Sequence, residues 1–226
     1  MTTTVLIVGA GSGISAAFAR VAAAHGHAVA LASRGGAQRD DGMADAHRFA
    51  CDASDAASVA ALFARIDAEL PPLEVVLYNA SARARGPLSE LAPADVQQAL
   101  QVGAFGAFLV AQQAARRMLA RGRGTILFTG ASASVKGYPQ SAPFAMAKFA
   151  QRGLAQSMAR ELAPRNIHVA HFVIDGAVRG AGASPMDTPD AQLEPDAIAQ
   201  TYWSVVRQPR SAWTWEVELR PWVEKF

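Results

Sequence analysis

Glycines near the start of the chain have the spacing of a turn that can bind phosphate. An apolar, strand-like run over residues 5–8 ends at Gly9, and Gly11 and Gly13 follow before a segment with helical periodicity. Where a buried strand ends in such a turn, backbone N–H groups at the positive end of the next helix can meet a pyrophosphate, and glycine keeps that approach free of side chains. A tight turn without a ligand would use the same glycines, so both interpretations stay open.

Ser33 and Arg34 stand about twenty residues after the last of these glycines, where a dinucleotide-binding chain reads the ribose of its cofactor. A carboxylate at this place would repel a 2′-phosphate, whereas a guanidinium pairs with it and can stack on adenine. We therefore expect a preference for NADP(H), with NAD(H) as a second choice. The alternative is that Arg34 is an ordinary solvated arginine.

The elements that must position these residues alternate along the chain. Apolar or β-branched runs predict strands at residues 4–8, 28–32, 48–51, 74–78, 125–129, 168–174 and, more weakly, 214–219. Helical periodicity covers residues 13–24, 56–69, 93–120, 141–163 and 195–206. Such alternation predicts an α/β fold, a Rossmann-type doubly wound parallel sheet of about seven strands with helices on both faces.

Composition narrows the functional classes. The 226 residues are 51% hydrophobic, and nothing divides them, so we expect one domain over residues 1–226. The net charge of +2 gives no reason to expect nucleic acid, and no apolar run of about 18 residues predicts a membrane span. One cysteine excludes an internal disulfide, and the histidines match no metal-ligand spacing, so we expect a cytoplasmic protein without a metal.

The order of these segments from Val5 to Val178 resembles the short-chain dehydrogenase/reductase family. Gly9-x-x-x-Gly13-Ile14 resembles the glycine motif of that family, although its final glycine is Ser15 here. Three later segments fall where the family has its adenine contact, its Asn-Asn-Ala-Gly segment and its Pro-Gly pair, namely Asp52, Tyr78-Asn79-Ala80-Ser81 and Asp175-Gly176. The second of these segments departs from the family at both outer positions.

The resemblance implies a dinucleotide site and its residues. The expected contacts are Gly9, Ser12, Gly13 and Ile14 with the pyrophosphate, Ser33 and Arg34 with the 2′-phosphate, Asp52 with adenine, Asn79, Ala80 and Ser81 along the adenosine, Lys148 with the nicotinamide ribose, and Gly176 and Val178 beside the nicotinamide. The resemblance also implies a homodimer or homotetramer formed through the helices expected at residues 93–120 and 141–163. A small-molecule substrate would lie under a loop at residues 180–195, which is rich in Gly, Pro, Ser and Asp.

The catalytic segment departs further from the family. There, a tyrosine four residues before a lysine donates a proton, a serine orients the carbonyl, and an asparagine completes a proton relay. Here Lys148 is present, but Phe144 falls at the tyrosine position, Gly103 at the asparagine position and Ala131 at the serine position, with Ser132 adjacent. We take Lys148, Ser132 and Phe144 as the candidate catalytic positions.

Phenylalanine cannot give or take a proton, and general acid–base catalysis contributes about 10²–10⁴ in rate. Tyr78, Tyr138 and Ser134 are other hydroxyl groups expected in loops at the same end of the sheet, and each could equally be an ordinary loop side chain. Two hypotheses follow. The chain is an NADP(H)-dependent oxidoreductase with altered catalytic residues, or it is a sensor or scaffold that binds the cofactor without chemistry.

Overall fold

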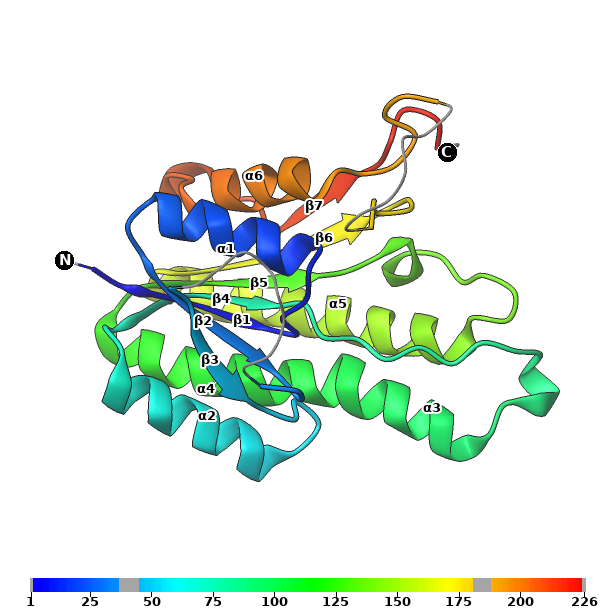
Figure 1. The fold of residues 1–226 in the computed structure, drawn as a ribbon, viewed down its shortest axis with the longest axis horizontal. Coiled ribbons are helices and arrows are strands. Elements are labelled where there is room, and N and C mark those ends of the chain that lie inside the picture. Colours follow the sequence, from blue (N-terminus) through cyan, green and yellow to red (C-terminus); the bar gives the residue numbers. More distant parts are fainter. Residues whose placement is uncertain (1, 37–44, 181–187, 225–226) are drawn as a thin grey trace.

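The computed structural model describes residues 2–36, 45–180 and 188–224 (Figure 1). Seven strands form one parallel sheet in the order β3-β2-β1-β4-β5-β6-β7. Their bounds are β1 Thr4–Val8, β2 Ala28–Ser33, β3 His47–Ala50, β4 Leu73–Tyr78, β5 Gly124–Thr129, β6 Ile167–Ile174 and β7 Glu216–Leu219. The sheet order reverses between β1 and β4, which confirms the predicted doubly wound fold.

Helices cover both faces of the sheet (Figure 1). Their bounds are α1 Ile14–Ala24, α2 Ala56–Glu69, α3 Pro93–Leu100, α4 Gly106–Arg121, α5 Ala142–Leu162 and α6 Pro195–Val206. α1 and α6 lie together on one face, whereas α2, α4 and α5 lie on the other. No helix in the described part of the chain combines the length and apolar character that a membrane crossing requires.

The central strand β1 shows why the sheet is buried on both faces. Val5 and Ile7 pack with the core under α1 and α6, while Leu6 and Val8 pack with the core under α2, α4 and α5. Successive side chains of a strand point to opposite faces, so an apolar residue is needed at every position when both faces are covered. The continuous apolar run that predicted this strand follows from that requirement.

The helix predicted over residues 93–120 is interrupted. A π-helical turn, Gln101–Phe105, separates α3 from α4. A Cβ added at Gly103 would lie 2.7 Å from the Cβ of Ala147, and one at Gly106 would lie 2.6 Å from both the Ala53 carbonyl oxygen and the Tyr78 hydroxyl. The extra residue of the π turn thus falls where the helix packs closely against its neighbours, a tertiary feature that periodicity does not encode.

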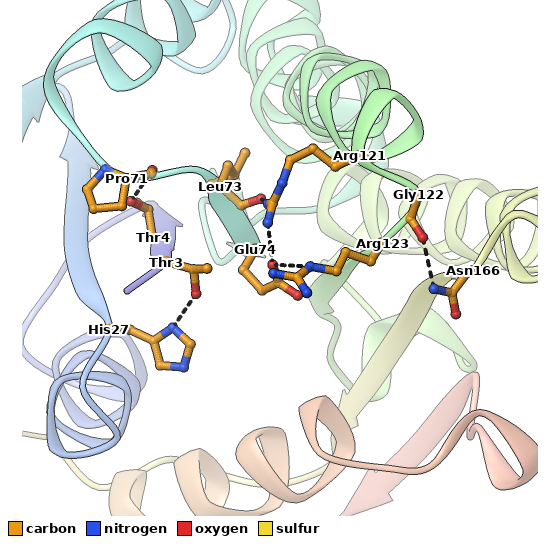
Figure 2. Close-up of polar contacts among 10 residues, drawn as sticks. All are labelled: Thr3, Thr4, His27, Pro71, Leu73, Glu74, Arg121, Gly122, Arg123 and Asn166. Carbon is orange, nitrogen blue, oxygen red and sulfur yellow. Dashed lines mark hydrogen bonds and ion pairs between the residues drawn. The ribbon is translucent and has the colours of Figure 1, made fainter. Parts of the chain in front are cut away.

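Polar contacts fix the amino-terminal edge of the sheet, opposite the glycine-rich turn (Figure 2). The carboxylate of Glu74 lies 3.0 Å from Nη2 of Arg121 and 3.3 Å from Nε of Arg123, and Arg121 also donates to the Leu73 carbonyl. These contacts join the end of α4 to the start of β4. The cavities described next open at the opposite, carboxyl-terminal edge of the sheet.

Candidate functional site

Three adjoining cavities open at the carboxyl-terminal edge of the sheet, with volumes of about 340, 370 and 580 Å³. We call them the nucleotide cavity, the central cavity and the outer cavity. Asn79 and Ser81 line both the nucleotide and the central cavity, while Arg83 and Phe144 line both the central and the outer cavity. The three therefore form one continuous path, and it begins where the strand order reverses, the usual ligand position in such sheets.

The nucleotide cavity gathers predicted cofactor residues from the ends of four strands. Those that line it are Gly9, Ser33, Arg34, Asp52, Asn79, Ala80 and Ser81. The Asp52 carboxylate accepts hydrogen bonds from the Ser54 hydroxyl at 2.6 Å and the Ser54 backbone N–H at 2.9 Å. These bonds lower the pKa of Asp52, and the charge of Arg34 acts in the same direction. Asp52 is thus a fixed, ionised acceptor beside a guanidinium.

Gly9 and Gly13, at the two ends of the first turn, have different roles. Gly9 has φ +91°, and a Cβ there would lie 2.3 Å from the backbone nitrogen of Ala80. Its small size lets the end of β1 pack against the segment after β4, which the fold needs even without a ligand. A Cβ at Gly13, by contrast, would meet no atom of the described residues within 4 Å. The open space at Gly13 is what a bound phosphate requires.

The start of α1 is suited to an anion. Gly13 precedes the helix, no side chain caps its first turn, and that turn contains no acidic residue. The first backbone N–H groups of a helix lack partners within it and carry partial positive charge. Ser12 and Gly13 line none of the three cavities; they lie in the turn between Gly11 of the nucleotide cavity and Ile14 of the central cavity. The arrangement fits the pyrophosphate of a dinucleotide.

Ser15, which the sequence analysis notes only as a departure from the family's glycine motif, has a structural role that the sequence did not predict. It is buried, its hydroxyl donates to the Gly9 carbonyl at 2.9 Å, and it accepts from Nδ2 of Asn79 at 2.8 Å. The hydroxyl therefore ties the glycine turn to the segment after β4. Nδ2 of Asn79 also donates to the Gly9 carbonyl at 3.4 Å, so this amide is held by the protein while its residue still lines two cavities.

Lys148 lies in the central cavity with only 3% of its surface exposed. Its Nζ donates to the Thr129 carbonyl at 2.6 Å and to Oε1 of Gln151 at 3.1 Å. Burial lowers the pKa of Lys148 to about 7, and the charge of Arg83 adds to that effect. An ammonium has three donors, so these two bonds leave one N–H for a ligand.

Gln151 is a second residue that sequence reasoning missed. It is fully buried in α5, one turn after Lys148, and its Nε2 has no partner among the described residues. The available signal was a polar residue three positions after a lysine of interest, on the same face of a predicted helix. Because its oxygen accepts from the lysine, Gln151 holds the Lys148 side chain in one position.

Phe144 lies one turn before Lys148 in α5. The guanidinium carbon of Arg83 is 4.3 Å from the centroid of the Phe144 ring, and Nζ of Lys148 is 5.8 Å from it. The negative face of an aromatic ring attracts cations at such distances. Phe144 thus stands between two cations at the junction of the central and outer cavities. Other predicted residues on the central cavity are Ile14, Gly176 and Val178.

The hydroxyl groups considered as substitutes for a catalytic phenol separate into two pairs. The interpretation of Tyr78 as a loop residue that reaches a substrate is wrong, because it is the buried last residue of β4 and its hydroxyl donates to the Val102 carbonyl. Ser134 is also buried, and its oxygen accepts from the Ala131 N–H at 3.1 Å. Ser132 and Tyr138 line the outer cavity and stay candidates.

The predicted substrate loop at 180–195 is described only at its two ends, because residues 181–187 lie outside the described residues. A parallel bridge joins Val178 to Leu193. Arg179 donates its backbone N–H to the Leu193 carbonyl at 2.9 Å, and Leu193 donates to the Ala177 carbonyl at 2.8 Å. These bonds fix both ends of the segment beside the central cavity.

Among the described residues, no group of three or more His, Cys, Asp or Glu residues is placed to hold a metal ion.

A doubly wound sheet with an uncapped helix start and a cavity at its reversal point defines a dinucleotide-binding domain. Comparison with known proteins places it more closely: the family model described as "short chain dehydrogenase" matches residues 3–200. The chain belongs to the short-chain dehydrogenase/reductase family, as the sequence analysis expected.

Several relatives and solved structures similar to this chain are oxidoreductases. The 3-oxoacyl-[acyl-carrier-protein] reductase MabA of Mycobacterium tuberculosis is 33% identical over 175 residues, which cover 77% of this chain and 68% of the relative. D-threitol dehydrogenase of Mycolicibacterium smegmatis is 33% identical over 171 residues, covering 73% of this chain and 66% of that protein. A short-chain dehydrogenase structure from Rhodopseudomonas palustris superposes with a TM-score of 0.82 at 36% identity, covering 97% and 99% of the two chains. A metagenomic short-chain oxidoreductase in complex with NADP gives a TM-score of 0.83 at 25% identity, covering 98% of each chain.

The two glycines give a matched test of the turn. Gly9→Ala forces a side chain against Ala80 at a positive φ, so it should lower the free energy of unfolding by about 2 kcal/mol or more in urea titrations. Gly13→Val places a branched side chain in open space, so the cost should not exceed about 1 kcal/mol. The same branched side chain should obstruct the phosphate and abolish NADPH binding in calorimetry. Unchanged NADPH affinity in Gly13→Val would mean that the glycines serve only the turn.

Proposed function

We propose that this protein is an NADP(H)-dependent oxidoreductase that transfers hydride between the nicotinamide and a small carbonyl or alcohol substrate. The observation that carries the proposal is the buried amine of Lys148, which lies in the central cavity between the nucleotide and outer cavities. Family membership and the named reductase and dehydrogenase relatives support it. The nucleotide, the reacting groups and the substrate would occupy the three cavities in that order, within one domain over residues 1–226.

The preference for NADP(H) rests on Arg34. It follows β2 directly, lines the nucleotide cavity with Ser33, and no acidic residue precedes it in that turn. The nearest acid in the cavity, Asp52, is engaged by Ser54 and suits the adenine rather than the ribose phosphate. A structural neighbour at 25% identity was solved with NADP, which agrees with this assignment. The guanidinium is the group that would pair with the 2′-phosphate.

The remaining cofactor contacts follow from the same geometry. Backbone N–H groups at Ser12, Gly13 and Ile14 would face the pyrophosphate, where the helix end is uncapped. Asn79, Ala80 and Ser81 would border the adenosine, and Gly176 and Val178 would border the nicotinamide. When bound, NADPH supplies the hydride to the carbonyl carbon. Every other part of the reaction has to come from residues of this chain.

Lys148 is the proton donor in this proposal. As hydride adds to carbon, the electron pair of the C=O bond moves to oxygen, and the ammonium of Lys148 transfers a proton to that oxygen. A pKa of about 7 suits both giving and regaining a proton near neutral pH. Thr129 and Gln151 hold the amine in place, so two donors are fixed and the third faces the reaction.

Two other residues assist in this scheme. Ser132 lines the outer cavity at the end of β5 and would donate a hydrogen bond to the substrate oxygen. Phe144 occupies the place of the family's tyrosine and provides a ring that positions Arg83 but no proton. The reaction then proceeds without a phenol, at a lower rate than a complete set of residues would allow.

A second function, cofactor-dependent sensing or scaffolding without turnover, is favoured by one specific observation. Neither Tyr78 nor Ser134 can replace the missing phenol, because each hydroxyl is buried and bonded within the protein. Only the oxidoreductase needs Lys148 as an acid; the sensor or scaffold does not. Measuring NADPH oxidation with aldehydes, ketones, quinones and enones distinguishes the two functions.

We also propose that the protein forms a homodimer or homotetramer through α4 and α5. Large apolar side chains are exposed on or beside these helices, namely Phe105, Phe108, Met146 and Phe149. The rings of Phe105 and Phe108 stack with their centroids 6.1 Å apart. An exposed apolar surface of this kind is typical of a protein interface.

The cofactor proposal predicts unequal affinities. Calorimetry should show NADPH binding at least about tenfold more tightly than NADH, and Arg34→Ala should remove most of that difference. Arg20→Ala is the matched control, since Arg20 pairs with Asp196 and lines none of the three cavities, so the ratio should stay as in the native protein. Equal affinities in the native protein would refute the role of Arg34.

The catalytic proposal predicts a pH profile for carbonyl reduction. The pKa of Lys148 is lowered to about 7, so its ammonium is present below that pH and is lost as the pH rises through it. The rate of NADPH oxidation should therefore fall by about tenfold per pH unit above pH 7, and the reverse oxidation should rise over the same range.

Two variants of Lys148 complete this test. Lys148→Met should abolish turnover, and Lys148→Arg, which keeps a cation that does not deprotonate near neutral pH, should lose both the rate and the pH dependence. A rate that persists in Lys148→Met would exclude the lysine as the acid. Tight NADPH binding without turnover on any substrate would favour the sensor.

A further inference from the structure

Two arginines of the segment after β4 line the outer cavity. Arg83 and Arg85 are two residues apart in a stretch without helical structure, and both border the 580 Å³ space. Arg83 borders the central cavity as well, whereas Arg85 borders only the outer one.

Within the part of the chain that the structure describes, these two cations have no acidic partner. No ion pair within 4.0 Å links Arg83 or Arg85 to a carboxylate anywhere in residues 2–36, 45–180 and 188–224. Loss of hydration against the protein lowers the pKa of Arg83, and the like charge of Arg85 lowers it further. The pair therefore stabilises an anion brought between or beside its members.

Of the two acids that line the same cavity, one is already matched by cations. Asp175 is buried, and its carboxylate lies 3.1 Å from Nζ of Lys136 and 2.9 Å from Nη2 of Arg220. It is thus already matched by two cations. Glu224 is the other acid that lines the cavity, and it lies near Gly176, on the side of the carboxyl end of β6. Arg83 and Arg85 belong to the segment after β4, so one side of the outer cavity is cationic. We call this side the cationic wall.

The position of this wall relative to the reacting groups sets an orientation. The guanidinium of Arg83 lies over the Phe144 ring, which is one helical turn from Lys148. Arg85 stands farther along the chain on the outer cavity alone. A substrate whose anion meets the arginines would direct its other end into the central cavity. Neutral polar residues, Tyr138, Gln140 and Ser141, complete the outer lining.

We propose that the outer cavity binds a small carbonyl compound that carries an anionic group, a carboxylate or a phosphate monoester, and that Arg83 and Arg85 hold this group. Two guanidinium groups present planar, paired donors that match the oxygens of such anions. This inference rests on the proposed oxidoreductase function, because it names the class of substrate for the same site. Arg85 lines neither the nucleotide nor the central cavity, so an effect of Arg85 on substrate binding can be told apart from an effect on cofactor binding.

A binding experiment tests the site without turnover. The NADPH-loaded protein is titrated in calorimetry with oxamate, inorganic phosphate and neutral acetamide. Oxamate or phosphate should bind, acetamide should not, and added salt should weaken the binding of the anion. Arg83→Met and Arg85→Met should each weaken it by about ten- to a hundredfold, the loss expected for a charge-assisted hydrogen bond. Arg85→Lys should recover part of the affinity, and Arg160→Met, a control outside all three cavities, should change nothing.

A kinetic experiment compares matched substrates. Oxo acids, their methyl esters and phosphorylated hydroxyketones are assayed by NADPH oxidation in the native protein and the same variants. Arg85→Met should raise KM for the anionic substrates by about ten- to a hundredfold and leave the esters unaffected. Preference for the carboxylate or the phosphate compounds identifies the anion.

The outcomes separate this inference from the function on which it rests. Arginine-dependent binding of oxamate or phosphate without any turnover supports the anion site and refutes the enzyme. Reduction of neutral carbonyls with no binding or kinetic preference for anions refutes the anion site and supports the enzyme. An Arg83→Met variant that loses only NADPH affinity, with Arg85→Met unchanged in every assay, also refutes the anion site.

Discussion

A lysine buried at the end of the central strands is the constraint on which this site depends. Lys148 is held by the carbonyl at the end of β5 and by Gln151 one turn farther along α5, and almost none of it meets solvent. Burying an ammonium is unfavourable, so it remains only where the surrounding structure fixes it or where its lowered pKa is used. This group lines the central cavity, which adjoins the other two.

The positions that the sequence analysis interprets as departures from the family pattern lie among local contacts of the structure. Ser15, in place of a glycine, links the glycine turn to Asn79 through two hydrogen bonds. Gly103 lies within a π-helical turn whose Val102 carbonyl accepts from the Tyr78 hydroxyl. Ser15 thus makes contacts within the protein itself, and Gly103 lies next to a residue that does. Phe144 follows the same logic, because its ring supports a guanidinium.

Much of the fold follows from local sequence. β1, α2 and α6 have the bounds that the sequence predicts, because β1 is a continuous apolar run and the apolar residues of α2 and α6 recur with the period of a helix buried against the sheet. The start of β7 was placed two residues early, at 214 rather than 216, in a stretch whose residues are only partly buried. Strand and helix periods report burial, so they lose precision where burial is incomplete.

The candidate site could be predicted only where a motif encodes it. The glycine turn, Arg34 and Lys148 carry recognisable spacing, and the structure brings their surroundings together. The π turn, the burial of Tyr78 and the bond from Lys148 to Gln151 depend on contacts between elements far apart in the chain, and no local pattern records them. The cationic wall formed by Arg83 and Arg85 can likewise be identified only once the cavity that they line is known.

The central claim is that the site retains hydride-transfer geometry around Lys148, its proposed proton donor, and that the phenyl ring at position 144 limits the rate because it supplies no phenol. The most direct measurement is carbonyl reduction by Phe144→Tyr at saturating NADPH. Nζ of Lys148 lies 5.8 Å from the centroid of the Phe144 ring, so a tyrosine at position 144 would place a phenol near this amine. Carbonyl reduction should therefore rise by about tenfold or more. A variant that binds NADPH normally and gains no rate on any carbonyl would contradict the account.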